Sequence, residues 1–196
     1  MRIIGGQAAN RTLRAPPGAA VRPTPDRVKL AVFNSLGPRV IGARVLDLFA
    51  GSGALGLECL SRAAAHLTAV EKNARHAAMI RRNCADAGLT SSGLDLRIQD
   101  AFAAIAQLDA ASARFDLVFA DPPFGEKNVG RPSASFAQQL LDNLQLPCLL
   151  SPAGLFILGH ARRDQLAVPV SWRELKILRH GDSWMRFLES ALPPTD

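Results

Sequence analysis

Short apolar runs alternate with amphipathic stretches along most of the chain. The apolar runs have the length of buried strands and cover residues 44–49, 67–71, 94–99, 115–120 and 154–159. The stretches between them have the length and periodicity of helices and cover residues 53–62, 74–87, 101–108 and 135–146. Strands that alternate with helices are typical of βαβ units built around a parallel sheet. The pattern therefore predicts an α/β fold with helices flanking a mostly parallel sheet.

The two ends of the chain depart from this alternation. Residues 25–36 follow or include a capping side chain, Thr24 or Asp26, and carry one apolar face, which predicts a helix before the first strand. Residues 172–180 and 183–189 are strand-like and are separated by Gly-Asp, which predicts an antiparallel hairpin with a tight turn. With the five apolar runs, this hairpin brings the expected sheet to seven strands.

The length and composition exclude several classes of protein. The chain of 196 residues suits one α/β domain with a small appendage. No apolar run approaches the ~20 residues that cross a membrane, and the first six residues lack the apolar core of a secretory signal. Cys59, Cys84 and Cys148 lie far apart and form no metal-binding or disulfide pattern. We therefore expect a cytoplasmic protein with reduced thiols and no metal site.

The net charge of +6 is concentrated near the beginning of the chain. Residues 1–44 hold eight basic residues and one acid, whereas residues 45–196 hold 15 basic and 16 acidic residues. Such asymmetry favours a polyanionic partner, above all nucleic acid, over the alternative of a solvated tail. We expect residues 1–42 to form a basic RNA-binding extension, partly mobile until RNA binds, and residues 43–196 to form the main domain. The candidate RNA contacts are Arg2, Arg11, Arg14, Arg22, Arg27, Lys127 and Arg131.

The first predicted strand leads into a glycine-rich turn. Gly51, Gly53 and Gly56 have the spacing GxGxxG, which lets the backbone approach a ligand closely at a first βα turn. The same spacing serves NAD, so it does not choose the cofactor by itself. Asp47 favours S-adenosylmethionine over NAD, because a carboxylate at this turn disfavours a pyrophosphate and attracts the sulfonium and ammonium groups of S-adenosylmethionine. We expect Asp47 to face solvent at the end of its strand.

Two more acids follow the next two predicted strands. Glu71 suits the diol of a ribose, and Asp100 suits an adenine amino group, with Phe102 against the adenine ring. Asp100 has an alternative role as the N-cap of the following helix. The candidate cofactor-binding residues are therefore Asp47, Phe49, Ala50, Gly51, Ser52, Gly53, Glu71, Lys72, Asp100, Ala101 and Phe102.

The most informative short motif is Asp121-Pro122-Pro123-Phe124, which follows the strand-like residues 115–120. Each proline fixes φ and lacks an N–H, so the carbonyl groups there stay free to accept hydrogen bonds. A carboxylate, free carbonyls and an aromatic ring within four residues suit a planar group that bears an NH2, most naturally a nucleobase. The alternative is a simple Asp-Pro turn. These four residues are the candidate catalytic residues, and we expect the polar residues that follow to form a mobile loop.

The glycine turn, the strand-end acids and the tetrapeptide stand in the order of the class I S-adenosylmethionine-dependent methyltransferases, which this chain resembles. Residues 1–6, the segment Arg22-Pro23-Thr24-Pro25-Asp26-Arg27-Val28 and residues 46–57 are similar to the RsmD family, whose members methylate guanine N2 in 16S ribosomal RNA. The resemblance implies a Rossmann-like fold, S-adenosylmethionine as the cofactor, and a monomer that acts on 16S rRNA, either free or within a partly assembled small subunit. It also implies that the tetrapeptide holds the amino group of the base.

The chain departs from the RsmD pattern at three places. The family usually has basic residues where Gln7 stands, an acid where Leu30 stands, and often a Glu near Gly159. Two other functions stay open. An adenine-N6 nucleic-acid methyltransferase is one, because a similar tetrapeptide serves that amino group, and a non-catalytic RNA-binding ribosome assembly factor is the other. Methyl transfer to guanine and adenine in RNA and DNA separates these functions.

Overall fold

A seven-stranded sheet forms the centre of the computed structural model, which describes residues 1–15, 24–124 and 133–193. The strand order is β3-β2-β1-β4-β5-β7-β6. β1 to β5 pair in parallel, and β7 lies antiparallel between β5 and β6. The strands are β1 (Arg44–Asp47), β2 (His66–Val70), β3 (Leu94–Arg97), β4 (Phe115–Ala120), β5 (Leu150–Ala161), β6 (Trp172–His180) and β7 (Ser183–Ser190). The predicted mostly parallel sheet with an antiparallel C-terminal hairpin is confirmed.

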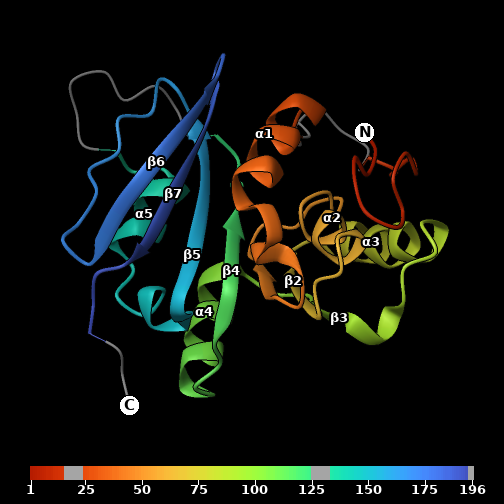
Figure 1. Cartoon of the computed structure of the whole chain (residues 1–196). Coiled ribbons are helices and arrows are strands. Elements are labelled where there is room, and N and C mark those ends of the chain that lie inside the picture. The colour runs from red at the N-terminus through yellow and green to blue at the C-terminus, as the bar shows by residue number, and fades with distance from the viewer. Residues whose placement is uncertain (16–23, 125–132, 194–196) are drawn as a thin grey trace.

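Helices cover both faces of this sheet (Figure 1). One apolar cluster packs α1, α2 and α3 against the sheet, and a second packs α4 and α5 against the opposite face. The helices are α1 (Asp26–Leu36), α2 (Gly56–Ser61), α3 (Ala74–Asp86), α4 (Ala101–Ala110) and α5 (Phe136–Asp142), with short 3-10 helices η1 (Gly37–Val40), η2 (Ser91–Gly93) and η3 (Pro147–Leu149). Among the described residues, no helix is both long enough and apolar enough to cross a membrane.

Two predicted helices differ from the observed ones at their ends. The helix predicted from residue 53 begins at Gly56, because Gly53 has a φ of 81° and belongs to the left-handed turn before it. The helix predicted to reach residue 146 ends at Asp142. There the Asn143 side chain accepts hydrogen bonds from the backbone N–H groups of Gln145 and Leu146, at 3.0 and 2.9 Å, and turns the chain.

The first 15 residues pack against the rest of the fold. Ile3 and Leu13 are buried in the same apolar cluster as α1 to α3. The backbone N–H of Ile4 donates to Glu58 Oε2 at 2.7 Å, and the Arg14 N–H donates to Asn83 Oδ1 at 2.9 Å. Residues 1–15 therefore pack on the domain through buried apolar side chains, and the mobility expected of the extension stays a prediction.

Candidate functional site

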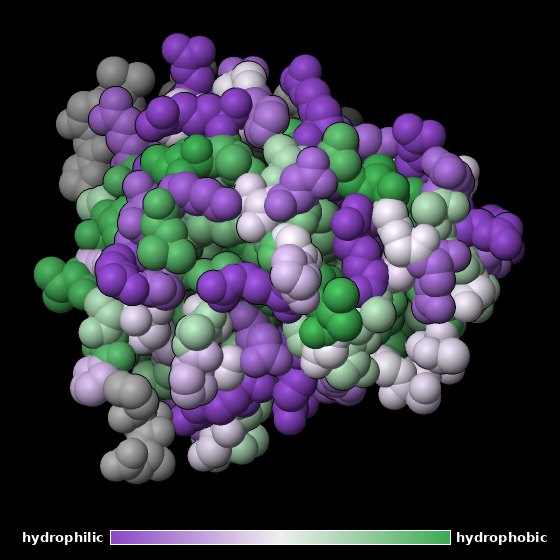
Figure 2. Space-filling view, viewed as in Figure 1, coloured by the Kyte–Doolittle hydropathy of each residue, from purple (hydrophilic) through white to green (hydrophobic). Residues whose placement is uncertain are grey.

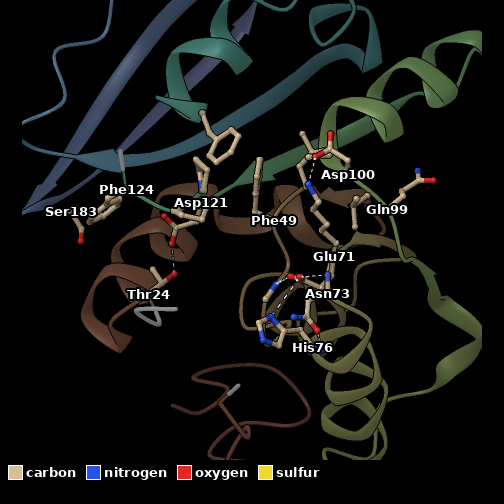
Figure 3. Close-up of a pocket in the computed structure, with 18 of the residues that line it drawn as sticks. Thr24, Phe49, Glu71, Asn73, His76, Gln99, Asp100, Asp121, Phe124 and Ser183 are labelled. Carbon is tan, nitrogen blue, oxygen red and sulfur yellow. Dashed lines mark hydrogen bonds and ion pairs between the residues drawn. The ribbon is translucent and has the colours of Figure 1, made fainter. Parts of the chain in front are cut away.

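A cavity of about 730 Å³ opens at the carboxyl ends of the parallel strands. This is the edge at which open α/β sheets bind their ligands. The loops after β1 to β4 form most of its wall, and segments from both ends of the chain complete it. The lining residues are Thr24, Pro25, Leu48, Phe49, Gly51, Val70, Glu71, Lys72, Asn73, His76, Gln99, Asp100, Ala101, Asp121, Pro122, Pro123, Phe124, Phe136, Ser183 and Met185. Figure 3 shows two polar groups in this cavity, one around Glu71 and Asp100 and the other around Asp121, with Phe49 between them.

The carboxylates of the first group accept hydrogen bonds from the backbone. Glu71 accepts from Gly51 N at 2.9 Å through Oε2 and from Asn73 N at 2.8 Å through Oε1. Asp100 Oδ1 accepts from Phe102 N at 2.9 Å and caps α4, while its Oδ2 lies 3.5 Å from Lys72 Nζ. The cap anticipated as the alternative role of Asp100 is present. Because these bonds tie the three βα loops together, this side of the cavity is formed before any ligand binds.

Asp47 lies beneath this wall, and the expectation that it faces solvent is wrong. Its side chain is 1% exposed, because it is the last residue of a central strand and pairs with Ala69 on one side and Phe119 on the other. Asp47 Oδ2 accepts from Gly56 N at 3.1 Å, and Oδ1 has no hydrogen-bond partner among the described residues. Burial raises the pKa of Asp47 from its ordinary value of 3.8 to about 7, and the nearby Asp121 and Glu71 add to the rise.

The second group is built around Asp121, at the end of β4. Thr24 Oγ1 donates a hydrogen bond to Asp121 Oδ2 at 2.5 Å, across 97 positions of sequence. Behind the carboxylate lies Gly159 of β5, where an added Cβ would stand 2.2 Å from Asp121 Oδ1. Burial raises the pKa of Asp121, and the Thr24 hydrogen bond acts in the opposite direction. Phe124, three residues further on, is 37% exposed and stands at the cavity wall.

The remaining candidate ligand residues divide into lining and supporting positions. Phe49, Gly51, Lys72 and Ala101 line the cavity, as do all four residues of the tetrapeptide. Phe102 does not line it and lies against Phe136, with ring centroids 6.3 Å apart, so that Phe136 takes the place at the wall. Three further candidates are buried behind the turn and do not line the cavity: Ala50, Ser52 and Gly53.

Several lining residues were missed from the sequence. Thr24 belongs to a segment noted for its family resemblance, yet nothing in the sequence pairs it with Asp121. Ser183 and Met185 lie on alternate positions of β7, for which the sequence predicted a hairpin strand and no contact with the cavity. The periodicity of α3 and α5 gives no reason to separate a wall residue from a packing residue. The missed polar and aromatic lining residues are Thr24, Asn73, His76, Gln99, Phe136 and Ser183.

The described candidate RNA contacts differ in how they are engaged by the rest of the protein. Arg2 and Arg14 form ion pairs with Asp26 and Asp86, at 3.1 and 3.3 Å. Arg11 is exposed on the N-terminal segment and Arg27 on α1. The other three candidates lie outside the described residues: Arg22, Lys127 and Arg131.

The acidic side chains of the cavity fit a large ligand with positive charge. Its volume lies within the range of small-molecule and cofactor sites. Glu71, Asp100 and Asp121 contribute carboxylates to its wall, and the buried Asp47 adds an unsatisfied oxygen beneath it. Several carboxylates around one cavity favour a cation and disfavour a pyrophosphate. The residues therefore fit the sulfonium cofactor expected from the sequence.

The chain is similar to known proteins over nearly its whole length. Residues 1–189 match the model of a family described as conserved hypothetical protein 95. A Haemophilus influenzae protein named ribosomal RNA small subunit methyltransferase D is 32% identical over 176 residues, which cover 90% of this chain and 86% of that protein. A solved structure of a hypothetical protein from Thermus thermophilus has a TM-score of 0.78 at 28% identity and covers 96% of this chain and 99% of that one.

A second solved structure shares the fold. It is a Thermus thermophilus 16S rRNA N2 G1207 methyltransferase in complex with AdoMet and guanosine. Its TM-score is 0.63 at 24% identity, and the match covers 88% of this chain and 44% of that one.

Proposed function

Since this chain belongs to the family described as conserved hypothetical protein 95, we propose that it methylates the exocyclic N2 of a guanine in 16S ribosomal RNA. It is an RsmD-like methyltransferase, and S-adenosylmethionine is its methyl donor. The observation that carries the proposed acceptor is the position of Asp121-Pro122-Pro123-Phe124 on the cavity wall opposite Glu71 and Asp100. Support for the RNA comes from relatives named small-subunit rRNA methyltransferases.

The β1 to β3 side of the cavity holds the cofactor. Glu71 has the reach and the charge to accept from the ribose hydroxyls, and the Phe49 ring lies beside the place that an adenine would take. Asp47, Asp121 and Glu71 together set a negative potential that attracts the sulfonium and ammonium groups. When bound, S-adenosylmethionine supplies an electrophilic methyl carbon and a neutral thioether leaving group.

The Asp121 side of the cavity holds the acceptor base. Guanine N2 is a poor nucleophile because its lone pair is delocalised into the ring. The Asp121 carboxylate and the Pro122 carbonyl accept hydrogen bonds from the two N2–H groups. These bonds turn the lone pair towards the methyl carbon as the nitrogen becomes tetrahedral. As the new N–C bond forms and the S–C bond breaks, N2 becomes cationic and then gives one proton to Asp121. Positioning and preorganised charge supply most of the acceleration.

Two further contacts complete the proposed complex. Phe124, exposed at the wall, stacks on the extruded base, which must leave its helix or loop to reach the cavity. Basic residues of the extension at 1–42 contact RNA phosphates, and residues 43–196 carry the methyl transfer. The proposed reaction takes place in the cytoplasm, on 16S rRNA that is free or partly assembled.

Identification of the methylated nucleoside tests this proposal. The purified protein is given S-adenosylmethionine with a labelled methyl group and, separately, 16S rRNA, small-subunit particles from a strain that lacks the protein, and DNA. After digestion, we expect the label in N2-methylguanosine from ribosomal RNA. Label in N6-methyladenosine would replace guanine N2 by adenine N6, and no transfer to any nucleic acid would contradict the proposal.

A further inference from the structure

Thr24, which precedes α1, contacts Asp121 on the side of the cavity proposed to hold the acceptor base, called the acceptor side below. Its hydroxyl donates to Asp121 Oδ2 at 2.5 Å, and both residues line the cavity (Figure 3). Among the described residues, this hydroxyl is the side-chain donor that Asp121 has. Hydrogen bonds to a charged acceptor are short and about twice as strong as neutral ones. The bond therefore fixes the carboxylate in one orientation.

The rest of the surroundings of Asp121 leave this role to Thr24. On β5 there is no side chain at Gly159, where the atoms nearest to an added Cβ would be those of the Asp121 carboxylate and, at 3.2 Å, the Met185 sulfur of β7. The ionisable neighbour is Asp47 of β1, which repels a negative charge on Asp121. A carboxylate offers about four acceptor positions, so one donated hydrogen bond leaves others open to a ligand.

We propose that Thr24 is a positioning residue whose hydroxyl orients the Asp121 carboxylate for the amino group of the acceptor base. This inference rests on the proposed function. The ionised form of Asp121 accepts hydrogen bonds through both oxygens and can take the released proton, and burial opposes ionisation by raising its pKa. The Thr24 hydroxyl opposes that rise, so its loss moves the pKa of Asp121 further upward. The acidic limb of the pH profile of kcat then moves to higher pH as well.

Two substitutions at one position test the proposal. Thr24→Val removes the hydroxyl and keeps the shape, whereas Thr24→Ser keeps the hydroxyl. We expect kcat of Thr24→Val to fall at least about tenfold, with its acidic limb shifted upward and its affinity for S-adenosylmethionine unchanged. Thr24→Ser should recover most of the rate and the wild-type pH profile. A purely structural role would lower kcat without moving the profile.

A carboxyl NMR titration gives a readout that does not need turnover. The pKa of Asp121 should be higher in Thr24→Val than in the wild type and in Thr24→Ser. Equal Asp121 pKa values in all three proteins would overturn the inference, and so would a Thr24→Val profile that coincides with the wild type. If the wild type transferred no methyl group to RNA while the titration behaved as expected, the proposed function would fail and the Thr24 contact would stand.

A separate observation concerns the turn between β6 and β7. In Figure 1 this turn projects beyond the end of β4, near the beginning of α1. Ser183, the first residue after the turn, lines the cavity, and the Arg162 N–H donates to the Asp182 carbonyl at 2.8 Å. An added Cβ at Gly181 would lie 3.7 Å from Arg27 Nη2. Three segments therefore meet at the turn beside the cavity.

The side chains around this turn are mainly cationic. Arg27, Arg162 and Arg179 are exposed, and none of them forms an ion pair with the residues that the structure describes. The Arg179 guanidinium lies 4.9 Å from the centroid of the Trp184 ring, which holds its planar group on the surface. Figure 2 shows hydrophilic side chains along the same upper edge of the molecule. The acid in the turn itself is Asp182.

We infer that this turn is an RNA-binding surface for the phosphates next to the nucleotide in the cavity. The inference also rests on the proposed function. Arginine suits phosphate because its planar fork donates two hydrogen bonds at once. The surface lies at the cavity through Ser183, whereas Arg11 and Arg14 lie on the N-terminal segment, and Arg14 is engaged by Asp86. The turn therefore binds the RNA phosphates close to the reacting base.

RNA binding across a salt series tests this surface. Arg162→Ala with Arg179→Ala should weaken RNA binding and flatten the log–log salt slope by roughly 1.4, about 0.7 for each lost phosphate contact. The matched control is Arg44→Ala with Arg81→Ala, which removes two exposed arginines; Arg44 lies at the amino end of β1, the end away from the cavity. A slope equal to that of the wild type in the first pair overturns the inference. If the slope of this double variant were unchanged while the wild type still methylated RNA, the inference about the turn would be wrong and the proposed function would stand. If the wild type neither bound nor methylated RNA, the proposed function would fail with it.

Discussion

The two sides of the cavity are built in different ways. On the β1 to β3 side, Glu71 and Asp100 each accept from backbone N–H groups within or between neighbouring loops, and Asp47 accepts from the turn that it precedes. On the acceptor side, Asp121 depends on Thr24, a residue 97 positions away, and on the empty space at Gly159. One side is held by local backbone bonds, and the other by contacts between distant segments.

This difference separates stability from chemistry. A carboxylate that already serves the backbone ties loops together and offers a ligand its remaining lone pairs. Asp121 makes no such backbone bond among the described residues, so its charge is reserved for a ligand and is costly to bury. Substitutions on the first side should therefore change cofactor binding and folding together, whereas substitutions on the second side should change turnover or RNA binding and leave cofactor affinity intact.

The largest expected effect comes from Asp121→Asn. Asparagine keeps the shape and the Thr24 contact but removes the negative charge, so kcat should fall on the order of 10²–10³-fold. The affinity for S-adenosylmethionine, measured by calorimetric titration, should change little. Asp100→Asn is the matched variant on the other side, because asparagine also caps helices. Asp100→Asn should lower the affinity for S-adenosylmethionine and leave kcat nearly unchanged. Equal effects of both variants on kcat would contradict the division of roles.

Asp47→Asn should change the pH dependence of folding. With a pKa of about 7 in the folded protein and 3.8 unfolded, the native state keeps a proton on Asp47 that the unfolded state loses between these values. The free energy of unfolding therefore falls by a few kcal/mol as pH rises from about 4 to about 7. Asparagine removes this fall while keeping an acceptor for Gly56 N. Urea denaturation of both proteins at several pH values measures it, and parallel curves would show that Asp47 is ionised in the native state.

The same carboxyl group links cofactor binding to protons. A cation near Asp47 favours its charged form, so S-adenosylmethionine should release a fraction of a proton from the wild type near pH 6.5. Calorimetric titration in buffers of different ionisation enthalpy detects the release. Asp47→Asn should bind without it and more weakly.

A smaller effect is expected for Phe124→Ala. Loss of base stacking should weaken RNA binding by about 1–3 kcal/mol, without a change in the salt slope, because stacking releases no counterions. The matched variant is Phe136→Ala, which removes the lining ring that contacts Phe49. Phe136→Ala should act on the cofactor. An RNA affinity that is unaffected by Phe124→Ala would remove this ring from the acceptor side.

The smallest effect is expected at the N-terminal segment. Arg11→Ala with Arg14→Ala should flatten the salt slope of RNA binding by at most about 1.4 and leave cofactor affinity intact. Arg14 should contribute less than Arg11, because Asp86 already pairs with it. The single variants, measured beside Arg44→Ala, separate the two. No change in slope for either arginine would mean that the basic extension does not bind RNA through these residues.

Sequence patterns predicted what local chemistry determines. The strands, the hairpin and the cap at Asp100 follow from alternation and from one residue's effect on its neighbours. The burial of Asp47 did not follow, because it depends on β1 having a partner on each side. The Thr24 contact could not be predicted, since nothing in the spacing of the chain indicates which distant hydroxyl reaches Asp121.

The missing side chain at Gly159 offers a tool for capturing the substrate complex. A methyl group there would stand 2.2 Å from Asp121 Oδ1 and displace the carboxylate without removing any polar group from the cavity. Gly159→Ala should therefore retain the residues that hold cofactor and RNA while turnover stalls. A stalled protein of this kind can be crystallised or imaged with both molecules in place, and the trapped RNA can be sequenced to read out the target nucleotide.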